Sequence, residues 1–229
     1  YDASLTDFRD IPVAEYDKSL QTLISQEGEA ITEQEHLKPL CCFQTPKGET
    51  VVDFGQNLTG YLSFAVDGQN GDKIEISHAE VMDREGNFYT ENYRAAKAKI
   101  HYTCADGQQS YKPKFTFFGF RYIRLDAWPE TLSEAVLGTD AFLAQFTAIA
   151  VNSQLKRTGH IKSSNDLLNK LFENVIWGQQ GNFLDIPTDC PQRDERPGWT
   201  GDAQAFVKTA SYNLEVERFS RKRLTALRS

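Results

Sequence analysis

The segment Lys73-Ile-Glu-Ile-Ser-His78 shows the pattern that decides the fold of most of this chain. Ile74 and Ile76 alternate with polar neighbours, and this period of two is typical of a strand with one buried face. Similar strand signals occur on both sides of it, at Val51–Phe54, Tyr61–Val66, Lys99–Cys104, Phe120–Leu125 and Ala141–Val151. Residues that favour turns separate these segments, at Asp67-Gly68, Asn70-Gly-Asp72, Glu85-Gly-Asn87 and Asp106-Gly107. Many short strands with turns between them predict an antiparallel β-sandwich.

The pattern becomes helical after Ser163. Apolar residues then recur as one broad helical stripe, at Leu167, Leu168, Leu171, Phe172, Val175 and Ile176. Ser163 or Ser164 is suited to cap this helix. A second helix is expected from about Asp202, and a third after Asn213 towards Leu224. Because so few helices cannot bury such broad apolar faces by themselves, we expect the chain to be part of a longer protein.

The composition narrows the class of protein. The 229 residues are 40% hydrophobic and 25% charged, which is typical of a soluble globular protein. The net charge of -7 argues against a nucleic-acid surface, and no apolar run is long enough to span a membrane. The four cysteines and four histidines lack the spacing of a zinc site, so we expect neither a metal nor another cofactor. The sequence leaves the cellular compartment open.

A charged loop lies between the first two predicted helices, from Gly181 to Asp202. Its prolines and glycines favour an ordered loop over a helix. It combines five carboxylates with two arginines and one tryptophan, at Asp185, Asp189, Asp194, Glu195, Asp202, Arg193, Arg196 and Trp199. Glycoside cleavage needs one carboxylic acid to protonate the leaving oxygen and a second carboxylate to activate water or attack the sugar. An aromatic ring can also pack on the sugar, so the loop fits this chemistry.

Other interpretations of the same residues remain open. The loop could be a charged surface segment that caps two helices. Its carboxylates could bind Ca²⁺, although the spacing of a regular calcium loop is absent. Cys190 is a poor candidate for a nucleophile, because no histidine stands near it in the sequence. His78 and His101 lie in strand patterns and are expected to be structural.

Two groups of motifs resemble the bacterial α-L-rhamnosidases of glycoside hydrolase family 78. The first is Asp189-Cys-Pro-Gln-Arg-Asp-Glu-Arg196 with Gly198-Trp-Thr-Gly-Asp202. The second resembles the β-sandwich domain that precedes the catalytic barrel in that family, and consists of Val52–Asn57, Gly60, His78–Glu80, Gly86-Asn87, Tyr89-Thr90 and Phe115–Tyr122. Together the two groups cover most of residues 46–229.

The resemblance implies a multidomain β + α chain, in which an antiparallel β-sandwich precedes the first helices of an (α/α)₆ barrel. Residues 1–45 are then expected to be the end of a preceding domain and its linker. Residues 46–155 would form the β-sandwich domain. Residues 156–229 would form the N-terminal part of the catalytic barrel, truncated.

The resemblance also implies an activity, which is the hydrolysis of terminal α-L-rhamnosides with inversion. The substrate would be a glycoside that contains rhamnose, and Glu195 would be the general acid. The residues that would contact the rhamnose are Asp189, Arg193, Trp199 and Asp202. Asp194 would be a supporting charge. Arg193 would orient the carboxylates and the sugar.

An inverting enzyme also needs a second carboxylate as its base, and in this family the base lies far downstream in the barrel. No residue of this chain matches that position, so we expect the chain alone to be inactive. Two alternatives are a β-sandwich that serves as a carbohydrate-binding module and an inactive fragment of a glycosidase. A homodimer of the full-length protein is one arrangement that the sequence leaves open.

Overall fold

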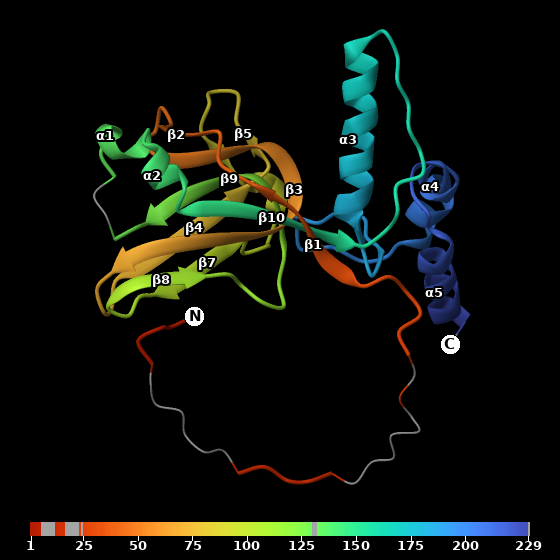
Figure 1. Ribbon diagram of the computed structural model, residues 1–229, viewed down its shortest axis with the longest axis horizontal. Helices are drawn as coiled ribbons and strands as arrows, with labels where there is room; N and C mark the ends of the chain where they lie inside the picture. The colour runs from red at the N-terminus through yellow and green to blue at the C-terminus, as the bar shows by residue number, and fades with distance from the viewer. Residues whose placement is uncertain (6–11, 17–22, 24, 130–131, 229) are drawn as a thin grey trace.

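The computed structural model describes residues 1–5, 12–16, 23, 25–129 and 132–228 (Figure 1). Within these residues, the main sheet has eight antiparallel strands, in the order β1-β10-β3-β9-β4-β7, with β2 and β8 also paired to β3. The strands are β1 (Ile31–Leu37), β2 (Cys41–Gln44), β3 (Thr50–Gly68), β4 (Lys73–Ala79), β7 (Lys99–Thr103), β8 (Gly107–Tyr111), β9 (Phe118–Ala127) and β10 (Phe146–Ser153). A small separate hairpin joins β5 (Val81–Met82) to β6 (Phe88–Tyr89), and a short 3-10 helix, η2 (Glu91–Tyr93), follows it.

Strand β3 connects the two layers of the sandwich because it changes partners along its length. Its first part pairs with β2 and β9, and its last part pairs with β10 and β8. The β3–β9 register shifts between Asp53 and Leu58. Gly55 lies in this irregular stretch with φ +74°, a conformation that costs glycine little. The two segments predicted as separate strands on either side of Gly55 are therefore one continuous strand.

The core of the sandwich consists of the inward-facing residues of these strands. Ile74 and Ile76 are fully buried, as their alternation predicts. Further fully buried side chains are Val52, Leu62, Phe64, Phe120, Ile123 and Phe146. The predicted class, an antiparallel β-sandwich followed by helices, is confirmed.

Two details of the expected strands are wrong or lie outside the described part. Ala141–Leu143 belong to a helical turn, α2 (Asp140–Leu143), which follows α1 (Glu134–Leu137). The side chain of Thr139 caps this turn by accepting a hydrogen bond from the Phe142 N–H at 3.2 Å, and the strand begins only at Phe146. Within residues 1–45, expected to be the end of a preceding domain and its linker, Gln21–Ile24 lies outside the described residues, apart from Leu23.

The three predicted helices are confirmed as α3 (Asp166–Asn182), α4 (Thr200–Asn213) and α5 (Glu217–Arg228). The predicted cap of the first helix is wrong. Asn165, and neither Ser163 nor Ser164, caps α3, because its side chain accepts from the N–H groups of the first turn at 3.0 and 3.4 Å. An Asn side chain satisfies these otherwise unpaired donors as well as a Ser does.

The helices lie together beside the sandwich in Figure 1. Trp177 of α3 packs against the sandwich core. Buried Gln179 and Asn213 join α3 to α4, since the Asn213 amide donates to Gln179 Oε1 at 2.8 Å. At the other end of α3, Leu168 and Leu171 are more than half exposed. No helix in the described parts of the chain is long and apolar enough to cross a membrane.

Candidate active site

The loop between α3 and α4 is held on both sides by contacts outside itself. It begins with a tight hairpin, β11 (Phe183–Leu184) and β12 (Ile186–Pro187), in which Asp185 has φ 67°. The Asp185 N–H donates to Ser153 Oγ at 2.8 Å, and its carboxylate binds Lys222 of α5. One of the five predicted carboxylates therefore points towards α5 and serves as an anchor.

Arg196 fixes the other side of the loop to the sandwich. Its guanidinium donates to the Phe117 carbonyl at 3.1 Å and lies 4.6 Å from the centre of the Phe117 ring. Burial lowers the pKa of Arg196 from its usual value. The backbone of Arg196 has φ 63°, an uncommon conformation for a residue with a side chain. This arginine therefore supports the loop and does not pair with its carboxylates.

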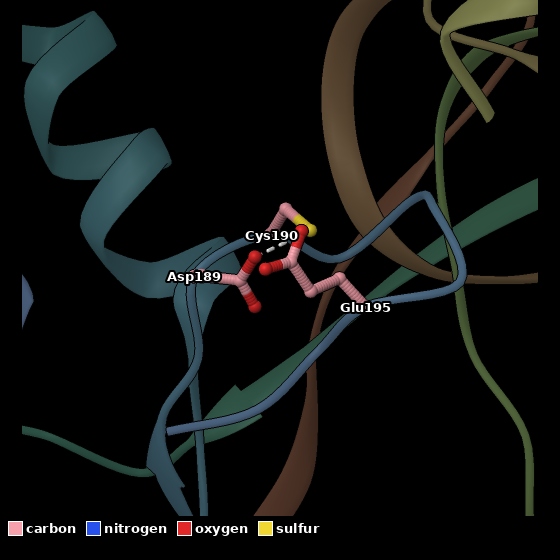
Figure 2. A group of neighbouring side chains, drawn as sticks. All are labelled: Asp189, Cys190 and Glu195. Atoms are coloured by element: carbon pink, nitrogen blue, oxygen red, sulfur yellow. Dashed lines mark hydrogen bonds between the residues drawn. The ribbon is translucent and has the colours of Figure 1, made fainter. Parts of the chain in front are cut away.

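Between these anchors, Arg193 lies between two carboxylates. Its Nη2 is 3.3 Å from Asp189 Oδ2 and 2.9 Å from Glu195 Oε2. Figure 2 shows the Asp189 and Glu195 side chains extending towards each other from opposite parts of the loop. A guanidinium in contact with both carboxyl groups favours their close approach.

Glu195 accepts two hydrogen bonds and forms a further ion pair. Arg193 and Arg94 both contact Oε2, at 2.9 and 3.1 Å, and the Trp199 indole N–H donates to Oε1 at 3.0 Å. Arg94 comes from the sandwich, directly after η2, whereas the other two contacts belong to the loop itself. These contacts hold the Glu195 side chain in place. The side chain is 26% exposed, so a ligand can still reach it.

Asp189 is the more buried of the two carboxylates, at 7% side-chain exposure. Burial alone would raise its pKa. Hydrogen bonds from the Cys190 thiol and from Arg193 outweigh burial, so the pKa of Asp189 is lower than usual. Its second oxygen, Oδ1, is buried and has no hydrogen-bond partner in the described structure. Asp189 is thus an ionised acceptor with one oxygen free for a hydroxyl group.

Cys190 is a buried thiol inside this cluster. Its Sγ lies 3.1 Å from Asp189 Oδ2, to which it donates, and Arg193 Nε donates to the same sulfur at 3.1 Å. Burial is the main cause that raises the pKa of Cys190, so the sulfur stays protonated and is a poor nucleophile.

The ligand atoms of Asp189, Cys190 and Glu195 all lie within 4.8 Å of one another (Figure 2). Three such groups could hold a metal ion. Arg193, however, makes a close contact with each of them, so its guanidinium occupies the place of a cation in the cluster. The arrangement favours a carboxylate site without a metal.

The remaining predicted site residues differ in their position. Trp199 precedes α4 and is 53% exposed, with its indole N–H directed to Glu195. Asp202 lies in the first turn of α4, and it lines the same cavity of about 770 Å³ as Asp189. Asp194 is exposed on the loop. The structure therefore gathers Asp189, Arg193, Glu195 and Trp199 through direct contacts, adds Asp202 through a shared cavity, and leaves Asp194 at the surface.

Arg94 also contacts this cluster, and the sequence motifs gave no indication of it. It precedes Glu195 by 101 positions, and no local pattern marks it. Its one unusual local feature is the backbone, with φ 55° and ψ -120°. Such a conformation costs energy and is often found where a side chain must be held in a particular place.

Comparisons with known proteins match both parts of the chain to domains of one protein family. Residues 43–151 match the model of the bacterial alpha-L-rhamnosidase concanavalin-like domain, and residues 156–229 match the bacterial alpha-L-rhamnosidase 6 hairpin glycosidase domain. The alpha-L-rhamnosidase of Streptomyces avermitilis is 40% identical over 182 residues, which are 79% of this chain and 17% of that protein. This chain therefore spans about a fifth of the length of such relatives.

Solved structures agree with this assignment. The alpha-L-rhamnosidase of Aspergillus terreus superposes with a TM-score of 0.82 and 42% identity, over 91% of this chain and 23% of that one. The Streptomyces avermitilis enzyme complexed with L-rhamnose also gives a TM-score of 0.82, with 36% identity over 90% of this chain and 19% of that one. The chain therefore belongs to the bacterial α-L-rhamnosidase family, with a concanavalin-like β-sandwich domain and the start of a six-hairpin glycosidase domain.

Proposed function

We propose that this chain supplies the proton donor and part of the sugar site of an inverting α-L-rhamnosidase. The observation that carries the proposal is the cluster around Arg193, in which two carboxylates lie side by side in different environments. Two carboxyl groups with different surroundings can take different roles in glycoside hydrolysis.

Asp189 suits the role of a sugar acceptor. Its lowered pKa keeps it ionised, and its unpaired Oδ1 can accept a hydrogen bond from a sugar hydroxyl. A relative of 36% identity has been solved with L-rhamnose bound, which supports rhamnose as the sugar. Asp202 would bind a further hydroxyl from the shared cavity, and the ring of Trp199 would pack on an apolar face of the sugar.

Glu195 suits the role of general acid. Its carboxyl is more exposed than that of Asp189, so it can reach the glycosidic oxygen, and two hydrogen bonds and an ion pair fix its orientation. In the reaction its proton passes to the leaving oxygen as the glycosidic bond breaks. Water, activated by a second carboxylate, attacks the opposite face of the sugar.

The base is not assigned to any residue of this chain. An inverting pair is separated by about 6.5–9.5 Å to leave room for water. The ligand atoms of Asp189 and Glu195 lie within 4.8 Å, which is too short for that arrangement. We therefore place the base elsewhere in the full-length protein and expect residues 1–229 alone to be inactive.

The decisive variant is Glu195→Gln in the full-length protein, because the amide keeps the size of the side chain and lacks the transferable proton. We expect kcat for a rhamnoside with a poor leaving group to fall by roughly 10²–10⁴-fold. Binding of L-rhamnose, measured by calorimetry, should be retained. Glu215→Gln, at an exposed position before α5, is the matched control and should keep wild-type turnover.

Near wild-type turnover by Glu195→Gln would rule out the assigned role. The stereochemistry is tested separately, by proton NMR at early times of the reaction. Inversion requires β-L-rhamnose to appear first, and initial formation of the α-anomer would show retention.

A further inference from the structure

Arg94 is a sandwich residue whose guanidinium contacts the catalytic loop. Its Nη1 lies 3.1 Å from Glu195 Oε2, although it belongs to a different domain from Glu195. The side chain is 55% exposed, so this contact is not explained by burial in a core. The backbone conformation at φ 55° is instead kept in place by η2, where the Arg94 N–H donates to the Glu91 carbonyl at 3.2 Å.

The contacts of Glu195 are distributed unequally between its two oxygens. Oε2 accepts a hydrogen bond from Arg94 and forms an ion pair with Arg193 at 2.9 Å, whereas Oε1 accepts from Trp199 among the described residues. A protonated carboxyl has one O–H donor, and its other oxygen remains an acceptor. The two positively charged guanidinium groups beside Oε2 would repel a proton placed there. The proton must then be carried by Oε1.

We propose that Arg94 is a positioning residue for the proton donor: with Arg193, it concentrates positive charge at Oε2 of Glu195 and so places the transferable proton on Oε1. The proposal rests on the role of Glu195 proposed above. In the reaction the O–H bond at Oε1 breaks, the proton passes to the glycosidic oxygen, and that oxygen keeps the electron pair of the broken C–O bond. Glu195 is left as a carboxylate whose Oε2 still contacts both arginines.

Through Arg94, the orientation of the Glu195 carboxyl also depends on the sandwich domain. Arg193 and Trp199 belong to the same loop as Glu195, so they move with it. In the part of the chain that the structure describes, Arg94 is the contact from outside the loop that orients this carboxyl. A small misplacement of a reacting group can lower the rate by up to about 100-fold, so loss of this contact should be measurable.

The test is Arg94→Met in the full-length protein, compared on two substrates. An alkyl rhamnoside has a poor leaving group and needs the proton, whereas 2,4-dinitrophenyl rhamnoside has a good leaving group and needs it little. We expect kcat/KM for the alkyl rhamnoside to fall by roughly 10- to 100-fold, and for the dinitrophenyl rhamnoside by less than about threefold. Arg94→Lys keeps the positive charge but lacks the several N–H donors of a guanidinium. Its kcat/KM for the alkyl rhamnoside should lie between the values of wild type and Arg94→Met.

Lys97→Met is the matched control, because Lys97 is an exposed cation in the same segment as Arg94 and should show no preference between substrates. Equal losses on both substrates for Arg94→Met, with a lowered Tm, would reduce Arg94 to a structural role. An unchanged or increased rate on the alkyl rhamnoside would overturn the proposal. Glu195→Gln is measured in parallel. If that variant shows no dependence on the leaving group, the proposed acid is wrong, whereas an effect in Glu195→Gln without one in Arg94→Met refutes only the role of Arg94.

Discussion

At the scale of single residues, the chain contains a histidine that is completely buried. His78 is fully buried in β4, with its ring stacked on Phe118 at 4.2 Å. Nδ1 lies 2.9 Å from the Ala98 carbonyl, and Nε2 has no partner in the described structure. Burial lowers the pKa of His78 from 6.5 to about 4. The folded protein therefore holds His78 in its neutral form, as a structural residue.

This environment predicts how stability depends on pH. The unfolded chain binds a proton at His78 below about pH 6.5, whereas the folded chain binds it only below about pH 4. Stability must therefore decrease as the pH falls from 6.5 to 4, by about 3 kcal/mol from this residue. His78→Gln keeps a donor for Ala98 and does not titrate. Its free energy of unfolding should vary less over this window than that of wild type, as measured by urea denaturation at several pH values. An equal slope for the two proteins would contradict the prediction.

The sequence predicted only part of the environment of the site residues. Asp189, Arg193, Glu195 and Trp199 stand close together in the chain, so a loop was enough to expect them near one another. Arg94 could not be found in this way, because its contact with Glu195 depends on how the helices dock on the sandwich. The roles assigned to the loop residues remain predictions, and the variants described above test them.

At the scale of elements, Gly60 marks the closest approach between two strands. It lies in β3 opposite Ala150 of β10. A Cβ added at Gly60 would lie 1.8 Å from the carbonyl oxygen of Ile149, which is a backbone atom and cannot rotate away. The pairing of β3 with β10 at this point therefore requires glycine for space rather than for backbone freedom.

We expect Gly60→Ala to cost about 3 kcal/mol of stability, because the strand pair must separate to admit the methyl group. Gly138→Ala is the matched control, since no heavy atom lies within 4 Å of its added Cβ and its φ of -85° suits alanine. Thermal unfolding followed by circular dichroism compares the two variants. Similar Tm values for both would show that the strands adjust more easily than their geometry indicates.

The elements also show where sequence patterns succeed and where they fail. Alternation located β4 because its first residues, Lys73 to Ile76, alternate between more exposed and buried positions, although Ser77, His78 and Ala79 are all buried. It missed β1, whose segment Ile31–Leu37 is mostly polar and exposed at the edge of the sheet. It misassigned Ala141–Leu143, because an apolar run fits a buried strand and a helical turn equally well. Helices α3, α4 and α5 were predicted because the apolar stripe of a helix repeats over several turns.

At the scale of the whole molecule, the apolar stripe of α3 has two different environments. Near the sandwich, Ile176 is 3% exposed. Towards the N-terminal end of the helix, Leu167, Leu168 and Leu171 are 80%, 53% and 57% exposed. Such a row of leucines costs free energy in water, and helices with an uncovered apolar face usually pack against another element. Since the chain contains only the start of a six-hairpin domain, we expect further helices of the full-length protein to cover this face.

The double variant Leu168→Ser with Leu171→Ser tests this expectation by comparing two contexts. In residues 1–229 both side chains lie mostly in water, so their replacement should change the free energy of unfolding by no more than about 1 kcal/mol. In the full-length protein, removal of two covered leucines should cost about 4 kcal/mol or more. Ile176→Ser is the control, because Ile176 is already buried here and its loss should destabilise both proteins. If the double variant has the same small effect in both contexts, the outer face of α3 stays in solvent in the complete enzyme, and its leucines serve another purpose than packing in the barrel.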